Sequence, residues 1–163
     1  MVHNFAVNGA TALRASDTPY WSQPVYLEAT NTNVDAVFIM LGTNDSKTLH
    51  WNNGHNSFSE DYYTLIKHFL SVDEPPKIWV GKNLPAFSDK WTINNHVIEQ
   101  QVHPIVEKIA ARLSIEIIDL HSQFINQPSL FSDGIHPNYE GGTILVNYLY
   151  SSITQYCIQI RCK

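Results

Sequence analysis

Short apolar runs alternate with longer segments of helical periodicity along the chain. Four of these runs predict strands: residues 2–7, 36–41, 77–81 and 115–119. The run 36–41 consists of six apolar residues closed by Gly42. A run of this kind predicts a strand buried on both faces. The run 2–7 alternates only weakly, and the Asn8-Gly9 turn signal ends it.

Three segments between and after these runs predict helices. Ser57 to Glu60 matches a capping box, and the apolar positions that follow have helical spacing. We therefore expect this helix to start near Ser57, with a loop at 50–56 before it. The apolar stripe of residues 92–113 contains Pro104, which predicts a kink or a fresh helix start. Asn138 is placed to cap a last helix.

This alternation of strands and helices predicts one α/β domain with a mainly parallel sheet. The 163 residues suit a single domain, and 44% hydrophobic residues provide for a core. A run of six apolar residues is far shorter than the roughly 20 that span a bilayer, so a membrane protein is excluded. With 10 basic and 15 acidic residues and no Lys/Arg cluster, nucleic acid is not an expected partner.

The residues that commonly bind metals do not form a site in this sequence. Cys157 and Cys162 lie together in the tail, whose alternating pattern resembles an edge strand. The eight histidines lack the spacing of metal ligands, so we interpret them as surface residues. We expect neither a metal nor a cofactor.

Polar, turn-rich segments follow three of the predicted strands. They are Asn8 to Thr11, Gly42 to Asp45 and, after a further loop, Ser132 to Asn138. Ligands of open α/β sheets bind beyond the carboxyl ends of the strands. We therefore expect these three segments to converge on one functional edge.

Asp133 and His136 form the sharpest chemical signal in these segments. A histidine that acts as a general base needs a carboxylate on one ring nitrogen, which fixes the tautomer and stabilises the imidazolium. A tight Asp-Gly-x-His turn allows the two side chains to meet without help from elsewhere. The alternative is a helix-capping aspartate beside a surface histidine.

Asn44 and Gly9 are candidates for binding an oxyanion. The Asn44 amide is a neutral donor at the end of a buried strand, and it suits a charge that exists only in the transition state. Gly9 offers a main-chain N–H with no side chain to block close approach. Turn chemistry alone is the alternative for both residues, because Asn and Gly commonly follow strands.

Taken together, these motifs resemble those of the SGNH/GDSL hydrolase superfamily. The segment 8–11 looks like its second block, Gly42-Thr43-Asn44-Asp45 matches its third, and Asp133-Gly134-Ile135-His136-Pro137 matches its fifth. The resemblance covers essentially the whole chain. It implies a three-layer α/β/α, flavodoxin-like fold, ester hydrolysis, His136 and Asp133 as triad base and acid, and Gly9 and Asn44 as oxyanion donors.

The first block of that superfamily, Gly-Asp-Ser, has no match in this sequence. Ser46 and Ser132 are not at a strand-to-helix turn, so we assign neither as the nucleophile. The simplest interpretation is a domain that lacks its first strand and helix, a unit of roughly 30–40 residues. We then expect the nucleophilic serine upstream of Met1 and an almost inactive chain.

The predicted activity is hydrolysis of a small ester, with an acylated carbohydrate as the specific substrate class. Asp45, His50 and Trp51 are the candidate substrate-binding residues, with loop packing as the equal alternative for the 50–56 segment. Tyr20-Trp21 and Trp91 are aromatic candidates for stacking on a sugar, or for packing. Two other hypotheses remain: a non-catalytic binding module of the same fold, and an unrelated α/β domain whose turns mimic the motifs.

Overall fold

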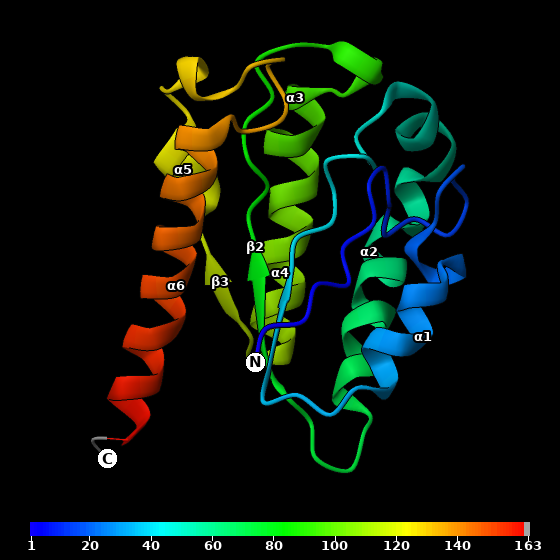
Figure 1. Ribbon diagram of the computed structural model, residues 1–163. Helices are drawn as coiled ribbons and strands as arrows, with labels where there is room; N and C mark the ends of the chain where they lie inside the picture. The colour runs from blue at the N-terminus through cyan, green and yellow to red at the C-terminus, as the bar shows by residue number, and fades with distance from the viewer. Residues whose placement is uncertain (162–163) are drawn as a thin grey trace.

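Three parallel strands form the sheet of this protein. The computed structural model describes residues 1–161 (Figure 1). The strands are β1 (Ala36–Ile39), β2 (Lys77–Gly81) and β3 (Glu116–Ile118), in the order β1-β2-β3. β2 therefore lies in the centre, and the carboxyl ends of all three strands meet at one edge of the sheet.

Helices connect the strands and follow them. The longer helices are α1 (Pro24–Asn31), α2 (Thr48–Leu70), α4 (His103–Leu113) and α6 (Tyr139–Arg161). The shorter ones are α3 (Asn95–Val97), α5 (Leu120–Phe124), the 3-10 turns η1 (Tyr20–Ser22), η2 (Lys90–Thr92) and η4 (Pro128–Leu130), and the π-helical turn η3 (Ile98–Val102). In the described part of the chain, no helix has the length and apolar character needed to cross a membrane.

The helices form two layers around the sheet. Alternate strand side chains such as Ile39 and Val80 pack in a core with α2 and α4. Trp79 and Ile118 belong to a second core, which Leu145 and neighbouring residues of α6 cover. Figure 1 shows α6 on one side of the sheet and α2 with α1 on the other. The structure thus confirms the predicted α/β/α fold class.

The first predicted strand is absent, because residues 2–7 form no strand. A strand needs a neighbour for its main-chain groups, and in the described residues β1 has only β2 as a strand neighbour. The Tyr20 hydroxyl instead donates to the Phe5 carbonyl at 3.0 Å. β1 is consequently an edge strand, with Ala36 exposed and Phe38 half-buried, rather than a strand buried on both faces as predicted.

Helix α2 starts at Thr48, nine residues before the predicted start at Ser57. The expected loop at 50–56 is therefore helical. Trp51 lies two helical turns before Phe58, and both are buried on the same side. The helix continues through Gly54, against which Leu13 packs so closely that a Cβ would lie 3.0 Å from the Leu13 methyl groups.

The interruption expected at Pro104 is confirmed. The π-helical turn η3 ends at Val102, and α4 begins at His103 with Pro104 in its first turn. The strand-like pattern of the tail was misleading, since α6 continues to Arg161. Cys162 lies outside the described residues. At the start of α6, Asn138 Oδ1 accepts the Gly141 N–H at 3.0 Å, as the capping prediction required.

Candidate active site

Asp133 and His136 meet in a tight turn after β3. Asp133 Oδ2 lies 2.8 Å from His136 Nδ1, while Oδ1 accepts the main-chain N–H groups of Ile135 at 2.8 Å and His136 at 2.7 Å. Gly134 has a φ of +81° and allows the turn to reverse. The carboxylate therefore fixes both the turn and the imidazole that the turn carries.

The electrostatics of this pair favour a charged carboxylate. The hydrogen bonds from His136 and Ile135 hold the pKa of Asp133 well below its usual range, the main-chain N–H of His136 contributing most. The His136 side chain is 59% exposed, and its Nδ1 faces Asp133. No hydrogen bond to His136 Nε2 occurs within residues 1–161. That nitrogen is available to an incoming group.

Asn44 lies in the turn that follows β1. Gly42 starts this turn with a φ of +131°, and a Cβ there would lie 2.7 Å from both Asn83 Oδ1 and Val102 Cγ1. Only glycine fits so close to these neighbours. Asn83 is fully buried, and its Nδ2 donates to Thr43 Oγ1 at 3.1 Å. The turn is thus held against β2 from inside.

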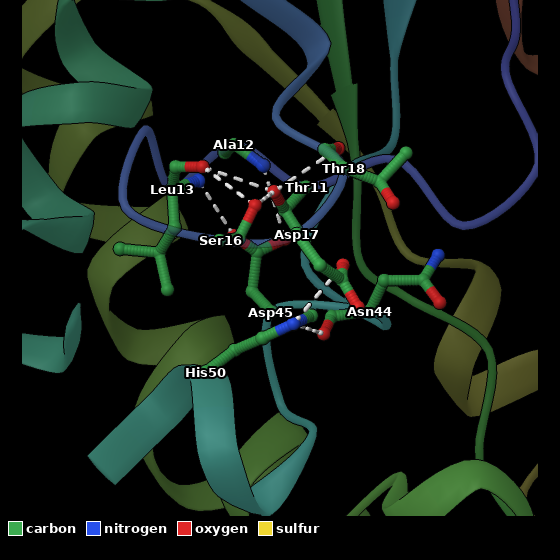
Figure 2. Close-up of polar contacts among 9 residues, drawn as sticks. All are labelled: Thr11, Ala12, Leu13, Ser16, Asp17, Thr18, Asn44, Asp45 and His50. Carbon is green, nitrogen blue, oxygen red and sulfur yellow. Dashed lines mark hydrogen bonds and ion pairs between the residues drawn. The ribbon is translucent and has the colours of Figure 1, made fainter. Parts of the chain in front are cut away.

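Asp45 ties the Asn44 turn to the loop that contains Gly9. Its buried carboxylate accepts the main-chain N–H groups of Ala12 at 3.1 Å and Leu13 at 2.7 Å (Figure 2). Burial raises the pKa of Asp45 to about 6, against the opposing effect of these bonds. Figure 2 also shows the Asn44 side-chain amide pointing away from this network. No hydrogen bond to that amide is present in the described chain.

His50, in the first turn of α2, contacts the main chain of Asn44. His50 Nδ1 lies 3.0 Å from the main-chain oxygen of Asn44, and Nε2 lies 3.1 Å from Asp17 Oδ1. A carbonyl oxygen and a carboxylate both act as acceptors. The two bonds therefore form together when both ring nitrogens carry protons. Sequence reasoning missed Asp17, which no motif distinguishes from other loop acids.

The remaining sequence candidates occupy different environments. Gly9 has a φ of +79° in a turn closed by the bond from Ala10 N to Val7 O at 3.2 Å. Trp51 is buried, and its indole N–H donates to Gln101 Oε1 at 2.8 Å. Asp45 and His50 are also buried. Direct substrate contact by these three side chains stays a prediction, as does the role of Gly9.

Residues 86–96 join the two halves of the site. At one end of this segment, the Asn94 N–H donates to Ser46 Oγ at 3.2 Å, two residues from Asn44. At the other end, the Phe87 N–H donates to the Gly134 carbonyl at 2.7 Å and the Ser88 hydroxyl donates to the Asp133 carbonyl at 2.9 Å. Sequence analysis did not select Ser88 or Asn94, because their contacts are long-range.

His121 of α5, a second buried histidine, makes similar contacts with the chain that follows β2. His121 Nδ1 lies 3.1 Å from the main-chain oxygen of Asn83, and Nε2 lies 3.2 Å from Glu99 Oε1. Glu99 also accepts a bond from Asn95 Nδ2 at 2.8 Å. The main-chain oxygens of Asn44 and Asn83 thus have the same kind of partner. Each contacts one nitrogen of a buried imidazole, and a carboxylate contacts the other nitrogen of that ring.

Neither a serine partner for His136 nor a metal site is found among the described residues. Ser46 is fully buried, and its hydroxyl donates to the Thr43 carbonyl at 2.7 Å rather than reaching His136. Ser132 is exposed next to Asp133. Among the described residues, no group of three or more His, Cys, Asp or Glu side chains is arranged to hold a metal ion.

Comparison with known proteins finds a matching family and similar structures. A model of the GDSL-like lipase/acylhydrolase family matches residues 1–144. An acetylxylan esterase of Xylanibacter ruminicola is 32% identical over 170 residues, a match that covers 93% of this chain and 35% of that protein. The chain thus spans about a third of the length of this curated relative.

Solved structures share the fold at low sequence identity. A carbohydrate acetylesterase from Sinorhizobium meliloti has a TM-score of 0.69 at 16% identity, covering 91% of this chain and 75% of that one. A carbohydrate esterase family 3 structure from Talaromyces cellulolyticus has a TM-score of 0.62 at 21% identity, covering 82% and 64%. The family match extends over the Asn44 turn and the Asp133–His136 turn alike, and on that basis this chain belongs to the GDSL-like lipase/acylhydrolase family.

Proposed function

We propose that this protein hydrolyses short acyl esters, and that its substrates are acetyl groups carried on carbohydrate. The observation that carries the proposal is the 2.8 Å contact between His136 Nδ1 and Asp133 Oδ2 on an exposed turn. The bond to Asp133 fixes the tautomer with its proton on Nδ1, which leaves the Nε2 lone pair to accept a proton. The acetylxylan esterase relative supports the choice of acyl group and alcohol.

The mechanism is acyl transfer to a serine hydroxyl. His136 Nε2 accepts the serine proton as the oxygen attacks the ester carbonyl, and Asp133 stabilises the imidazolium. The Asn44 amide and the Gly9 N–H donate to the oxyanion. The imidazolium then protonates the departing alcohol, and a water molecule activated by His136 releases acetate. In this proposal the serine belongs to a segment outside residues 1–163.

The test uses the natural protein, as its host produces it. We expect acetate release from acetylated xylo-oligosaccharides and from p-nitrophenyl acetate, and a loss of about 10⁴-fold or more in turnover for His136→Ala. A fluorophosphonate should label one serine, located by mass spectrometry. Hydrolysis without any labelled serine would overturn the serine mechanism. The remaining mechanism would be direct attack on the ester by a water molecule that His136 activates.

A non-catalytic binding module is the second candidate. It is favoured by the absence, within residues 1–161, of a serine hydroxyl hydrogen-bonded to His136. In that case the natural protein would bind its ligand and release no acetate from either ester above the rate in buffer.

A further inference from the structure

An open hollow lies beside the candidate active site, along the 86–96 segment. It has a volume of about 540 Å³ and includes Thr48 of α2 and Ser88, Asp89, Thr92 and Asn94 of the segment in its lining. Pockets for small molecules have volumes of about 300–1,000 Å³. The Asn94 bond to Ser46 and the Ser88 bond to Asp133 connect the segment that lines the hollow to the Asn44 turn and to the Asp133–His136 turn.

The lining of the hollow combines polar and apolar residues and carries few charges. Asp89 and His96 are its ionisable residues, and five of its ten residues have hydroxyl or amide side chains. Such groups donate and accept hydrogen bonds as sugar hydroxyls require. A long acyl chain would need a continuous apolar wall, whereas Ile93 is buried and the other two apolar lining residues, Ala86 and Phe87, are half-buried. A phosphate is best bound by Arg or Lys side chains, and the lining contains neither.

Trp91 does not line the hollow itself, but it lies in the same segment, between the lining residues Asp89 and Thr92, and has an exposed aromatic side chain. Its side chain is 55% exposed, although large apolar side chains are usually covered. Its ring centroid lies 5.4 Å from that of His136, at an interplanar angle of 65°. The indole therefore lies directly beside the proposed general base.

The backbone holds Trp91 in a strained conformation. Trp91 and Thr92 have φ values of +54° and +62°, in the left-handed region that side chains rarely adopt. Such strain tends to occur at ligand-binding and catalytic sites. Asn94 and Ser88 anchor the segment on both sides of the strained pair. The fold therefore maintains an exposed indole where simple packing would not require one.

We propose that this hollow binds the sugar on the alcohol side of the ester, and that Trp91 stacks on the sugar ring. The proposal rests on the proposed function for its assignment of the sugar to the leaving side. An alcohol bound next to His136 would depart toward the imidazolium that protonates it. Ser88, Thr92 and Asn94 then provide hydrogen bonds to ring hydroxyls, while Trp91 contributes an apolar face.

Sugar binding can be tested without any catalytic step. The full 163-residue chain, labelled with ¹⁵N, is titrated with acetylated xylotriose and followed by NMR. We expect the Trp91 indole N–H and the Asn94 amide to shift together. Trp91→Ala should weaken binding about five- to tenfold, and Trp91→Phe should recover part of the affinity. Tyr150→Ala, which removes an aromatic 69% exposed on α6, is the matched control.

The outcomes separate this inference from the proposed function. Trp91-dependent binding by a natural protein that releases no acetate would support the sugar site and refute ester hydrolysis. An active natural protein in which Trp91→Ala leaves KM equal to wild type for the acetylated sugar would overturn the sugar site alone. Tighter competition by hexanoate than by xylotriose for the Trp91 resonance would overturn it as well.

Discussion

His50 and Asn44 are joined by a hydrogen bond between the His50 ring and the Asn44 main chain, with 3.0 Å between Nδ1 and the carbonyl oxygen. The ring is 4% exposed, and its other nitrogen contacts Asp17. The bond holds the main chain of the turn while the Asn44 amide remains unoccupied. His50 thus acts on Asn44 as a positioning residue, six positions along the chain.

Replacement of His50 by Phe should lower turnover without weakening substrate binding. The substitution keeps a ring of similar size and removes the bond to the Asn44 carbonyl, so the amide loses its fixed direction. Loss of one oxyanion donor costs about 10²–10³ in kcat, and a misdirected donor should cost about 10–10²-fold. Steady-state kinetics of the natural protein on p-nitrophenyl acetate should give a reduced kcat and an unchanged KM.

His55→Phe is the matched control for this prediction. His55 lies on the same helix, and its Nδ1 also contacts a main-chain carbonyl, that of Trp51 at 2.9 Å. It is exposed and has no contact with the Asn44 turn. If both variants retained the wild-type kcat, positioning by His50 would be wrong.

Asp133→Asn should disable the histidine while preserving the turn. The asparagine oxygen can still accept from the Ile135 and His136 N–H groups, but its NH₂ group would face Nδ1 and favour the wrong tautomer of the imidazole. A comparable change in a serine protease lowers kcat about 10⁴-fold. Turnover of the acetyl ester and the melting temperature should separate the two effects, with a large loss in the first and a small one in the second.

Because the pKa of Asp133 is lowered, its stabilising contribution has a definite pH dependence. The contribution is present above the ordinary pKa of an aspartate and is lost as the pH falls through the lowered value. The wild-type protein should therefore keep this pair intact through mildly acidic conditions. Disappearance of the Asp133–His136 contact at pH 5, seen in the ¹H NMR signal of the Nδ1 proton, would contradict the assignment.

Asp45→Ala should destabilise the fold more than the loss of a surface carboxylate does. It leaves the Ala12 and Leu13 N–H groups buried without an acceptor, at about 1–3 kcal/mol each. We expect the free energy of unfolding in urea to fall by about 2–4 kcal/mol. Asp61→Ala, which removes the acceptor of the exposed Arg14 N–H, should cost less than about 1 kcal/mol. Equal losses in the two variants would contradict this account of Asp45.

His103 should make the protein sensitive to acid. Burial, together with the neighbouring His121 and Lys82, lowers the pKa of His103 to about 4, against the opposing effects of the Asn83 main chain and Asp119. Its Nε2 is buried without a partner in the described residues. Between pH 6.5 and 4 this histidine is protonated in the unfolded chain and neutral in the folded protein. The free energy of unfolding therefore falls as the pH falls.

The His103 contribution can be isolated by substitution. His103→Phe removes the titrating group, and on the order of 2 kcal/mol of the acid destabilisation should disappear with it. Urea unfolding at pH 7 and pH 4.5 measures the difference. His96→Phe, at an exposed position on α3, is the control, and its free energy of unfolding should depend on pH as that of the wild type does. A variant at 103 that retained the full acid sensitivity would exclude His103 as its source.

The local motifs of the site could be predicted from sequence, because each is built within a few consecutive residues. The Asp133–His136 contact needs only a turn of four residues, and the Asn138 cap needs only the helix start after it. The fresh helix start at Pro104 followed in the same way from a single local constraint. Short-range geometry of this kind is recorded directly in residue order.

Longer-range features could not be predicted in this way. The run 2–7 alternates as a strand would, but within residues 1–161 it pairs with no strand, so the alternation alone did not predict its structure. The early part of α2 contains Gly54, on which Leu13 packs, a contact between residues far apart in sequence. The same holds for Asp17 with His50 and for Ser88 with Asp133. A contact between residues far apart in the sequence produces no periodic pattern of residue types, so the sequence alone does not reveal it.

The proposed sugar site would couple substrate recognition to the chemistry, because hydrogen bonds connect both ends of residues 86–96 to the site. A sugar bound on this segment would act on the Asn44 turn through Ser46 and on the proposed general base through Asp133. Binding energy from the non-reacting part of a substrate can thus be converted into alignment of the reacting groups. A minimal ester such as p-nitrophenyl acetate forgoes that energy, and its penalty should fall on the rate of turnover as much as on affinity.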